Sequence, residues 1–471
     1  MKVSLAGNLH NRRADTAYDM RLVNCYPETV TNPVTGEKRA YVIKRPGLAQ
    51  YSAPAGAVAG RGVFYWGQTG KVYSVFGNTV YANTASLGTI TTSTGMCTIE
   101  ATAGATPRLV ITDGTKGYTV STSDVLTEIT DVDFPTSLVP GIAYLDQYTF
   151  VMKSNGEIYN SDLANPTSWV SSNYITAENS PDKGVALAKQ KNQVIAFGEY
   201  STELFYDAAN ATGSPLLRTE GAILQIGLAG KWTVTPFPIK ERLAWVAQTR
   251  NGGRSVYMLA GFEPSIISNG SVDRLLEAEG ANIVNAVGYG VEVGGATFYF
   301  LRLTNTTIAC NLGEKAWFEV QSGSSTFAGV AATDINGTYV IQGASDGKLH
   351  TIAQTNYQDT GSTAINVKIV TDMMDFGAPG LWKFCDRLGL HGEKASVTSN
   401  VSIRQTDDDY QTWSTARTID MSLVTPEIYR MGSFKRRAFE LTHSANTALL
   451  LEALDLDLDI EGRRPEKNGE Q

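Results

Sequence analysis

The chain has 471 residues, of which 42% are hydrophobic and 18% are charged. This apolar share can form a core, so the composition excludes a chain that is disordered throughout. The formal net charge is −8, whereas a protein built to grip nucleic acid is expected to be basic. No run of about 18 uncharged apolar residues occurs, so we expect no membrane anchor. The first residues lack the apolar stretch of a signal peptide, which predicts synthesis and folding in a cytoplasm.

The opening segment, residues 1–60, contains the sequence Arg45-Pro46-Gly47. Proline presets φ at the second position of a β-turn and glycine accepts a positive φ at the third, so these residues predict a turn. We expect residues 1–60 to form an N-terminal segment that packs on the next domain. Within it, His10, Arg12 and Arg13 form either a basic docking arm or part of a frayed terminus.

Short strands separated by tight turns fill residues 61–360. In residues 62–81, three strand-like runs are separated by Gln68-Thr69-Gly70 and by Gly77-Asn78. Further units of this kind are 108–120, 141–159, 185–206, 243–265, 283–320 and 327–350. Equivalent turns recur about every 40 to 50 residues, the length of a four-stranded propeller blade. The sequence predicts an all-β fold with a β-propeller of about six or seven blades. Stacked β-sandwiches also fit, but six similar units favour the propeller, and the best helix candidate, 272–281, is short.

From residue 361 the pattern changes to longer alternating strands, which predict an appended C-terminal antiparallel β-sandwich domain over 361–460. The expected strands are 365–372, 388–390, 397–405, 434–441 and 449–460. Residues 461–471 form a polar tail.

The sequence 406–413 resembles an Asp-box, with Tyr410 at the position of the usual glycine. Such boxes are hairpin-turn devices in which the aspartate caps backbone N–H groups and Trp413 would pack beneath. A turn is therefore expected here, rather than a catalytic site.

The cysteines and histidines lack the spacing of a metal site. The cysteines are Cys25, Cys97, Cys310 and Cys385, and the histidines are His10, His350, His391 and His443. The cysteines are far apart and form no CxxC motif, so we expect reduced, buried thiols. No Gly-rich phosphate loop occurs. We expect no catalytic residue, no metal and no cofactor.

A series of short motifs lies in a distinctive order along the first half of the chain. They are residues 21–28 (RLVNCYPE), 45–48 (RPGL), 161–163, 165–166, Trp169, 177–178, 181–182, 197–198, 201–203, 205–207 and 227–231 (GLAGK). Their order and spacing resemble the packaged-DNA stabilisation proteins of short-tailed bacteriophages, the tail-hub family, most clearly over residues 17–260.

This resemblance implies a structural virion protein without enzymatic activity, made in the host cytoplasm and located in the tail. Members form a homo-oligomeric ring, a hexamer, below the portal and its adaptor protein. The ring carries tailspike and tail needle proteins and closes the head after packaging, so genomic DNA contacts it only in passage during genome ejection. The resemblance transfers no interface residues, because no short motif marks them.

The run 454–461 alternates apolar and acidic residues, which in a strand places the carboxylates on one face. These carboxylates belong to Asp455, Asp457, Asp459 and Glu461. Neighbours on that face are about 7 Å apart, too far for two of them alone to hold Ca²⁺. One interpretation is a solvated face opposite Arg436 and Arg437. The other is an acidic ladder at a ring interface or lumen, where it would repel phosphate.

An enzymatic alternative is a propeller glycosidase acting on bacterial surface polysaccharide, which needs two opposed carboxylates at the funnel. A sugar-binding tail module without catalysis is the third class. A concave funnel lined by Trp or Tyr with Asp or Glu would favour either of these, whereas a plain packed channel would favour the hub.

Overall fold

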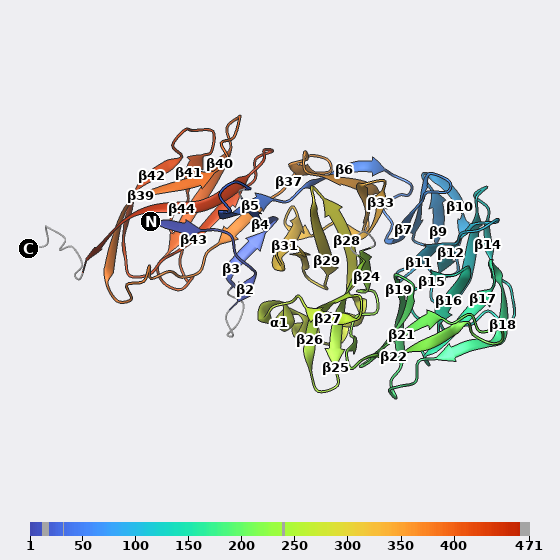
Figure 1. Cartoon of the computed structure of the whole chain (residues 1–471). Helices are drawn as coiled ribbons and strands as arrows, with labels where there is room; N and C mark the ends of the chain where they lie inside the picture. The colour runs from blue at the N-terminus through green and yellow to red at the C-terminus, as the bar shows by residue number, and fades with distance from the viewer. Residues whose placement is uncertain (12–17, 32, 238–240, 462–471) are drawn as a thin grey trace, which may run out of the picture. The chain divides into compact units, whose positions relative to one another are not determined.

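A computed structural model describes residues 1–11, 18–31, 33–237 and 241–461. Strands dominate these residues (Figure 1), together with the helix α1 (Gly270–Ala278) and the 3-10 helix η2 (Gly280–Asn285). Neither described helix has the length and apolar character needed to span a bilayer. The chain divides into two compact units: unit 1 comprises Met1–Leu48, Thr306–Phe327 and Ala353–Gln471, and unit 2 comprises Ala49–Asn305 and Ala328–Ile352.

Unit 2 is a succession of small antiparallel sheets, of which the first four have four strands each. The first contains β7 (Gly60–Trp66), β8 (Lys71–Phe76), β9 (Thr79–Ala82) and β10 (Ala85–Thr89). The second contains β11 (Thr98–Ala101), β12 (Arg108–Thr112), β13 (Gly117–Ser121) and β14 (Leu126–Glu128). The third contains β15 (Ala143–Leu145), β16 (Tyr148–Met152), β17 (Glu157–Asp162) and β18 (Asn165–Thr176). The fourth contains β19 (Gly184–Gln190), β20 (Gln193–Gly198), β21 (Thr202–Asp207) and β22 (Leu216–Leu224).

Three further groups of strands complete unit 2. The fifth sheet contains β23 (Gly227–Leu228), β24 (Thr235–Phe237), β25 (Arg242–Thr249), β26 (Gly252–Ala260) and β27 (Glu263–Ile266). The hairpin of β28 (Val287–Val293) and β29 (Ala296–Arg302) follows. The last sheet contains β33 (Gly329–Ile335), β34 (Thr338–Gly343), β35 (Leu349–Ala353) and β6 (Gly47–Ser52).

One strand from each of these groups contacts the next in cyclic order. The order is β7, β11, β15, β19, β24, β28, β33 and again β7. In Figure 1 these strands lie around a common centre, while β10, β14, β18 and β22 lie farther out. The all-β prediction is confirmed, and the cyclic order is the arrangement expected of propeller blades.

Neighbouring sheets of unit 2 share apolar cores. Trp66 and Tyr73 of the first sheet pack in one cluster with Leu109 and Ile111 of the second. Comparable clusters join the second sheet to the third, the third to the fourth and the fourth to the fifth. The sheets therefore pack face against face, since each buries its apolar side chains on those of the next.

Turn residues end the strands where their backbone chemistry requires. The Gly70 N–H donates to the Trp66 carbonyl at 2.9 Å, which closes the predicted turn between β7 and β8. Asn336 and Gly337 both adopt positive φ, 51° and 90°, as a two-residue hairpin turn requires. The helix α1 begins two residues before the expected start, because Asn269 caps the N–H groups of Ser271 and Val272, both at 3.0 Å.

Unit 1 contains two sets of strands, which are antiparallel except that β3 pairs with β31 in parallel. In one, the order is β4 (Cys25–Thr31), β5 (Lys38–Lys44), β44 (Leu450–Glu461), β39 (Trp382–Gly392) and β42 (Glu427–Phe434), with β1 (Lys2–Ser4) beside β44. The other contains β31 (Ala316–Ser322), β3 (Tyr18–Val23), β38 (Val367–Val370), β43 (Ala438–His443), β40 (Asn400–Thr406) and β41 (Arg417–Asp420). The remaining short strands are β2 (His10–Asn11), β30 (Thr307–Asn311), β32 (Ser325–Thr326), β36 (Gln358–Asp359) and β37 (Thr363–Ala364). The stacking of the two sets into a sandwich stays a prediction.

The unit boundaries differ from the expected ones at residues 60 and 360. The N-terminal 48 residues belong to unit 1, because β5 pairs with β44 and β3 pairs with β38. Pairing between strands so distant in the chain leaves no local sequence pattern. The strand expected over 434–441 is in fact two strands, since β42 ends at Phe434 and β43 begins at Ala438.

The predicted turn at Arg45-Pro46-Gly47 is also wrong in its detail. Gly47 begins β6 and has no positive φ. A Cβ on Gly47 would lie 2.1 Å from the Gln358 carbonyl oxygen, so glycine is required by the close approach of two backbones.

Candidate functional site

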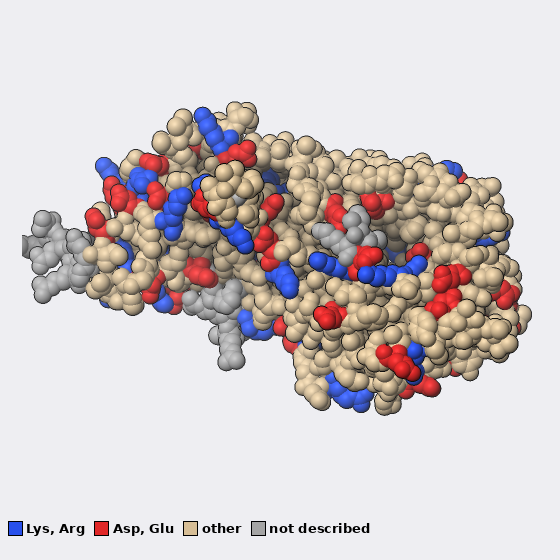
Figure 2. Space-filling view, viewed as in Figure 1, with Lys and Arg blue, Asp and Glu red and all other residues tan. Residues whose placement is uncertain are grey.

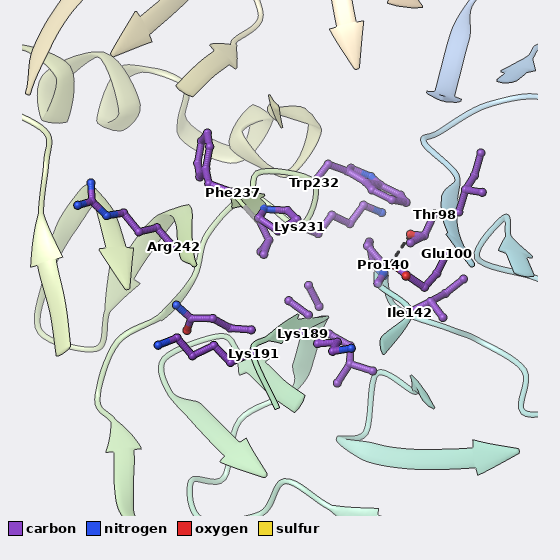
Figure 3. A pocket seen from close by; sticks show the side chains of 18 of the residues that line it. Thr98, Glu100, Pro140, Ile142, Lys189, Lys191, Lys231, Trp232, Phe237 and Arg242 are labelled. Carbon is purple, nitrogen blue, oxygen red and sulfur yellow. Dashed lines mark hydrogen bonds between the residues drawn. The ribbon is translucent and has the colours of Figure 1, made fainter. Parts of the chain in front are cut away.

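A cavity of about 560 Å³ lies among the inner strands of unit 2. Strands of the second, fourth and fifth sheets, the segment just before β15 and the segment between β23 and β24 line it (Figure 3). Its lining includes Thr98, Ile99, Glu100, Pro140, Ile142, Lys189, Lys191, Lys231, Trp232, Pro236, Phe237, Glu241 and Arg242. The channel is therefore hollow here rather than plainly packed.

Trp232 lies where three cavities adjoin. It lines the central cavity, a second of about 410 Å³ bordered by β7, β28 and β33, and a third of about 360 Å³. The backbone fixes its place, because the Gly288 N–H donates to the Trp232 carbonyl at 3.0 Å. The buried Thr233 next to it donates to the Gly230 carbonyl at 2.7 Å, and its own carbonyl accepts from the Tyr299 hydroxyl at 2.8 Å.

Basic side chains outnumber acidic ones around the central cavity. The basic ones are Lys189, Lys191, Lys231 and Arg242, and the acidic ones are Glu100 and Glu241. Lys191 and Glu241 form an ion pair at 2.7 Å, and the Lys189 ammonium donates to the Tyr144 carbonyl at 2.6 Å. Burial raises the pKa of Glu100 to about 7, although Lys189 opposes this shift. Lys189, Lys231, Arg242 and Glu100 form no ion pair with any described residue.

These features bear on the expected alternatives. A concave cavity lined by Trp232 with Glu100 is the combination expected of a glycosidase or a sugar-binding module rather than of a hub with a plain packed channel. Glycoside hydrolysis needs two carboxyl groups with separate roles. Because Glu241 is paired with Lys191, the cavity leaves Glu100 as its one carboxyl group without an ion pair among the described residues.

The acidic ladder on β44 is not uniform. Asp455 is bound by Arg387 at 2.9 Å and by the N-terminal ammonium at 3.4 Å, and these partners hold its pKa below the usual value. Asp457 and Asp459 are exposed, and their carboxylates form no hydrogen bond or ion pair with a described residue. Glu461 ends the strand, but its side chain lies outside the described residues.

The interpretation that places this ladder opposite Arg436 and Arg437 is wrong. The neighbours of β44 are β39, β5 and β1, so the strand does not pair with β43. Arg436 instead binds Asp409 at 2.6 Å, and Arg437 binds Asp407 in a two-point ion pair at 2.7 and 2.8 Å. Alternation predicts which face a residue occupies but not which strand lies beside it.

The Asp-box segment is a turn, as predicted. Asp408 accepts hydrogen bonds from the Thr412 N–H at 2.9 Å and from the Thr406 hydroxyl at 2.8 Å. The Thr412 hydroxyl also donates to Asp408, and this bond, followed by the other two, lowers the pKa of Asp408 to about 2. Tyr410 has a φ of 66°, the left-handed conformation for which the usual glycine is suited. The Trp413 ring lies against the guanidinium of Arg404 at 4.9 Å.

The remaining candidate residues are not brought into one site. His10 lies in β2, which pairs with β3, while Arg12 and Arg13 lie outside the described residues. Burial and Lys44 lower the pKa of His443 to about 4. The four cysteines are buried free thiols, as predicted. Within the described residues, no group of three or more His, Cys, Asp or Glu could hold a metal ion.

No pattern in the sequence predicts the central cavity. Lys231 ends the motif Gly227-Leu228-Ala229-Gly230-Lys231, which indicated only the family resemblance. The basic residues come from separate strands and loops, so no spacing along the chain connects them.

Comparisons with known proteins identify the family. Solved structures that resemble the chain include a virginiamycin B lyase from Staphylococcus aureus, at 10% identity over 65% of this chain and 98% of that chain, with a TM-score of 0.43. The computationally designed Ika8 protein matches at 10% identity over 64% and 99%, with a TM-score of 0.39. Scores this low carry no argument about activity, and the search of curated proteins found no match. The family described as "Bacteriophage P22 Gp10, beta-propeller" matches residues 1–357. The chain therefore belongs to this family of phage structural proteins, which stabilise packaged DNA.

Proposed function

We propose that the chain is the tail hub of a short-tailed phage. It assembles into a hexameric ring between the portal-adaptor assembly and the distal tail, carries tailspikes or the tail needle, and closes the head after packaging. The observation that carries this proposal is the family match over residues 1–357. In this hub, unit 2 is a seven-bladed propeller and the two sets of strands in unit 1 stack as a sandwich.

The physical character of the chain supports a structural role. Shared cores between successive sheets make unit 2 stiff, and the loops between its strands can hold several partners at fixed positions. A closed ring needs two complementary faces on each copy, repeated around an axis. Such faces require a rigid subunit more than they require any reactive group.

Its charge supports passage of DNA rather than tight binding. The net charge is −8, and on the face that Figure 2 shows, acidic and basic side chains are interspersed without a broad basic area. The exposed Asp457 and Asp459 are suited to a surface that repels phosphate. We place them at the lumen or at an interface of the ring.

Electron microscopy of isolated virions tests the proposal. We expect six copies in a ring below the portal, and filled heads made without the protein should lose their DNA to added nuclease. A copy number or position outside the tail would overturn the hub assignment. Heads that retain DNA in its absence would overturn the closure role.

A further inference from the structure

Beyond this structural role, we propose that the central cavity of unit 2 binds a short acidic peptide segment that carries an apolar side chain. The segment belongs to another protein of the assembly. Its apolar side chain would occupy the cavity wall, and its carboxylates would lie beside the basic residues.

The charge of the cavity favours an anionic ligand. Lys231, Lys189 and Arg242 have no carboxylate partner among the described residues, whereas Lys191 and Glu241 neutralise each other. This basic group stands out in a chain with a net charge of −8. The attraction between a carboxylate and an unpaired cation is stronger in a recessed site than on an open surface, because less water screens the charges.

The walls favour a ligand that is partly apolar. Ile99, Ile142, Pro140, Pro236 and Phe237 line the cavity together with Trp232. Inorganic phosphate would leave these side chains uncovered, and a volume of about 560 Å³ cannot admit a DNA duplex. An extended segment with one or two apolar side chains matches both the volume and the lining.

The polar side chains argue for a peptide over a sugar. The Thr98 hydroxyl already accepts from the Gly141 N–H at 3.1 Å. The Gln190 amide donates to the carbonyls of Glu241 at 2.7 Å and Leu259 at 3.2 Å. A sugar needs many free partners for its hydroxyl groups, and the Gln190 amide N–H groups are already used in bonds within the protein. A peptide carboxylate needs cations, which the cavity has.

Glu100 adds a dependence on pH. The charged groups that line the cavity with it are Lys189, Lys231, Arg242 and the Lys191–Glu241 pair. Below a pH of about 7 the Glu100 carboxyl is largely protonated and can donate a hydrogen bond to a peptide carbonyl. Above it, the ionised carboxylate repels the ligand, so binding should weaken as the pH rises from 6 to 8.

The test uses the full chain and anilinonaphthalene sulfonate, a fluorescent probe that is itself apolar and anionic. We expect the peptide acetyl-Phe-Glu-Leu-Asp-amide to displace it at least about tenfold more effectively than acetyl-Phe-Gln-Leu-Asn-amide. Lys231→Gln and Arg242→Gln should each weaken the acidic peptide about fivefold. Lys394→Gln, an equal loss of charge at an exposed site in unit 1, should change nothing. Glu100→Gln should remove the pH dependence of peptide binding.

Equal displacement by both peptides would overturn the proposal, and so would an equal effect of Lys394→Gln. Stronger displacement by glucuronic acid than by the acidic peptide would assign the cavity to acidic sugars instead. None of these outcomes bears on the hub assignment, which depends on the position and symmetry of the protein in virions.

Discussion

Arg45 and Asp359 form a buried two-point ion pair within unit 1, although 314 residues separate them in the chain. The guanidinium donates to the two carboxylate oxygens at 3.0 and 2.6 Å, and the two side chains are only 3% and 6% exposed. Arg45 also donates to the Asn24 side chain at 2.8 Å and to the Gln321 carbonyl at 2.8 Å. One side chain thus joins four separate segments of unit 1.

We expect Asp359→Asn to lower the free energy of unfolding of unit 1 by about 3 kcal/mol, because it leaves a buried guanidinium without its counter-charge. Urea unfolding of the purified protein measures this. The control is Glu37→Gln, which breaks the exposed pair of Glu37 with Arg39 and should leave the unfolding midpoint unchanged. If both variants shift the unfolding midpoint equally, the buried ion pair does not contribute specially to the stability of unit 1.

Arg45 also shows what the sequence can and cannot predict. Its neighbours Pro46 and Gly47 indicated a turn from local chemistry alone, whereas Gly47 is required by the approach of a segment more than 300 residues away. The turns at Gly70 and Gly337 were predictable because turn geometry depends on adjacent residues. Pairing of β5 with β44 depends on the whole fold.

The dependence on the whole fold also explains why the candidate sites could be predicted only in part. The alternation of residues 454–461 predicted a strand, and β44 includes them, but alternation could not show that Arg387 binds Asp455 while Asp457 stays exposed. Trp232 was one aromatic residue among many in the sequence. Only the cyclic packing of seven strands places it between three cavities.

Arg61 holds the segment between the first and second sheets of unit 2 in place through hydrogen bonds. Its buried guanidinium donates to the carbonyls of Gly77 at 2.7 Å, Thr92 at 2.6 Å and Thr94 at 2.8 Å. We expect Arg61→Met to lower the free energy of unfolding by about 3 kcal/mol, since several partly buried carbonyls lose their donor. Hydrogen–deuterium exchange should show the loss first over residues 77–97. A uniform increase in exchange across unit 2 would contradict a local role for Arg61.

His443 should make unit 1 sensitive to acid. It is 2% exposed, and its Nε2 lies 3.0 Å from the Ser399 hydroxyl oxygen and 3.3 Å from that of Thr447. Its pKa is lowered from 6.5 to about 4, so the folded state favours the neutral ring. The resulting stability is complete above pH 6.5 and is lost as the pH falls toward 4, because the unfolded chain binds the proton more readily.

We therefore expect unfolding midpoints in urea to fall between pH 7 and pH 5, and His443→Gln to reduce that fall. His391→Gln is the matched control, because that histidine is partly exposed and its pairing with Asp455 is long, at 3.8 Å. An equal reduction in both variants would show that burial of His443 is not the cause.

The last prediction concerns the exposed end of the acidic ladder. Asp457→Lys with Asp459→Lys should leave the fold intact, because neither carboxylate has a partner among the described residues. Asp455 is left unchanged, since its ion pair with Arg387 would confound the result. In assembled particles the double variant should slow genome ejection, because cations at a lumen wall attract phosphate where carboxylates repel it.

The control is Glu393→Lys, a charge reversal at another exposed site of unit 1. Ejection kinetics measured at low and high salt show whether the effect comes from contact with phosphate, since such a contact weakens as the salt concentration rises. Normal ejection at low salt would remove the ladder from the lumen, and failure of particles to assemble would place it at an interface instead.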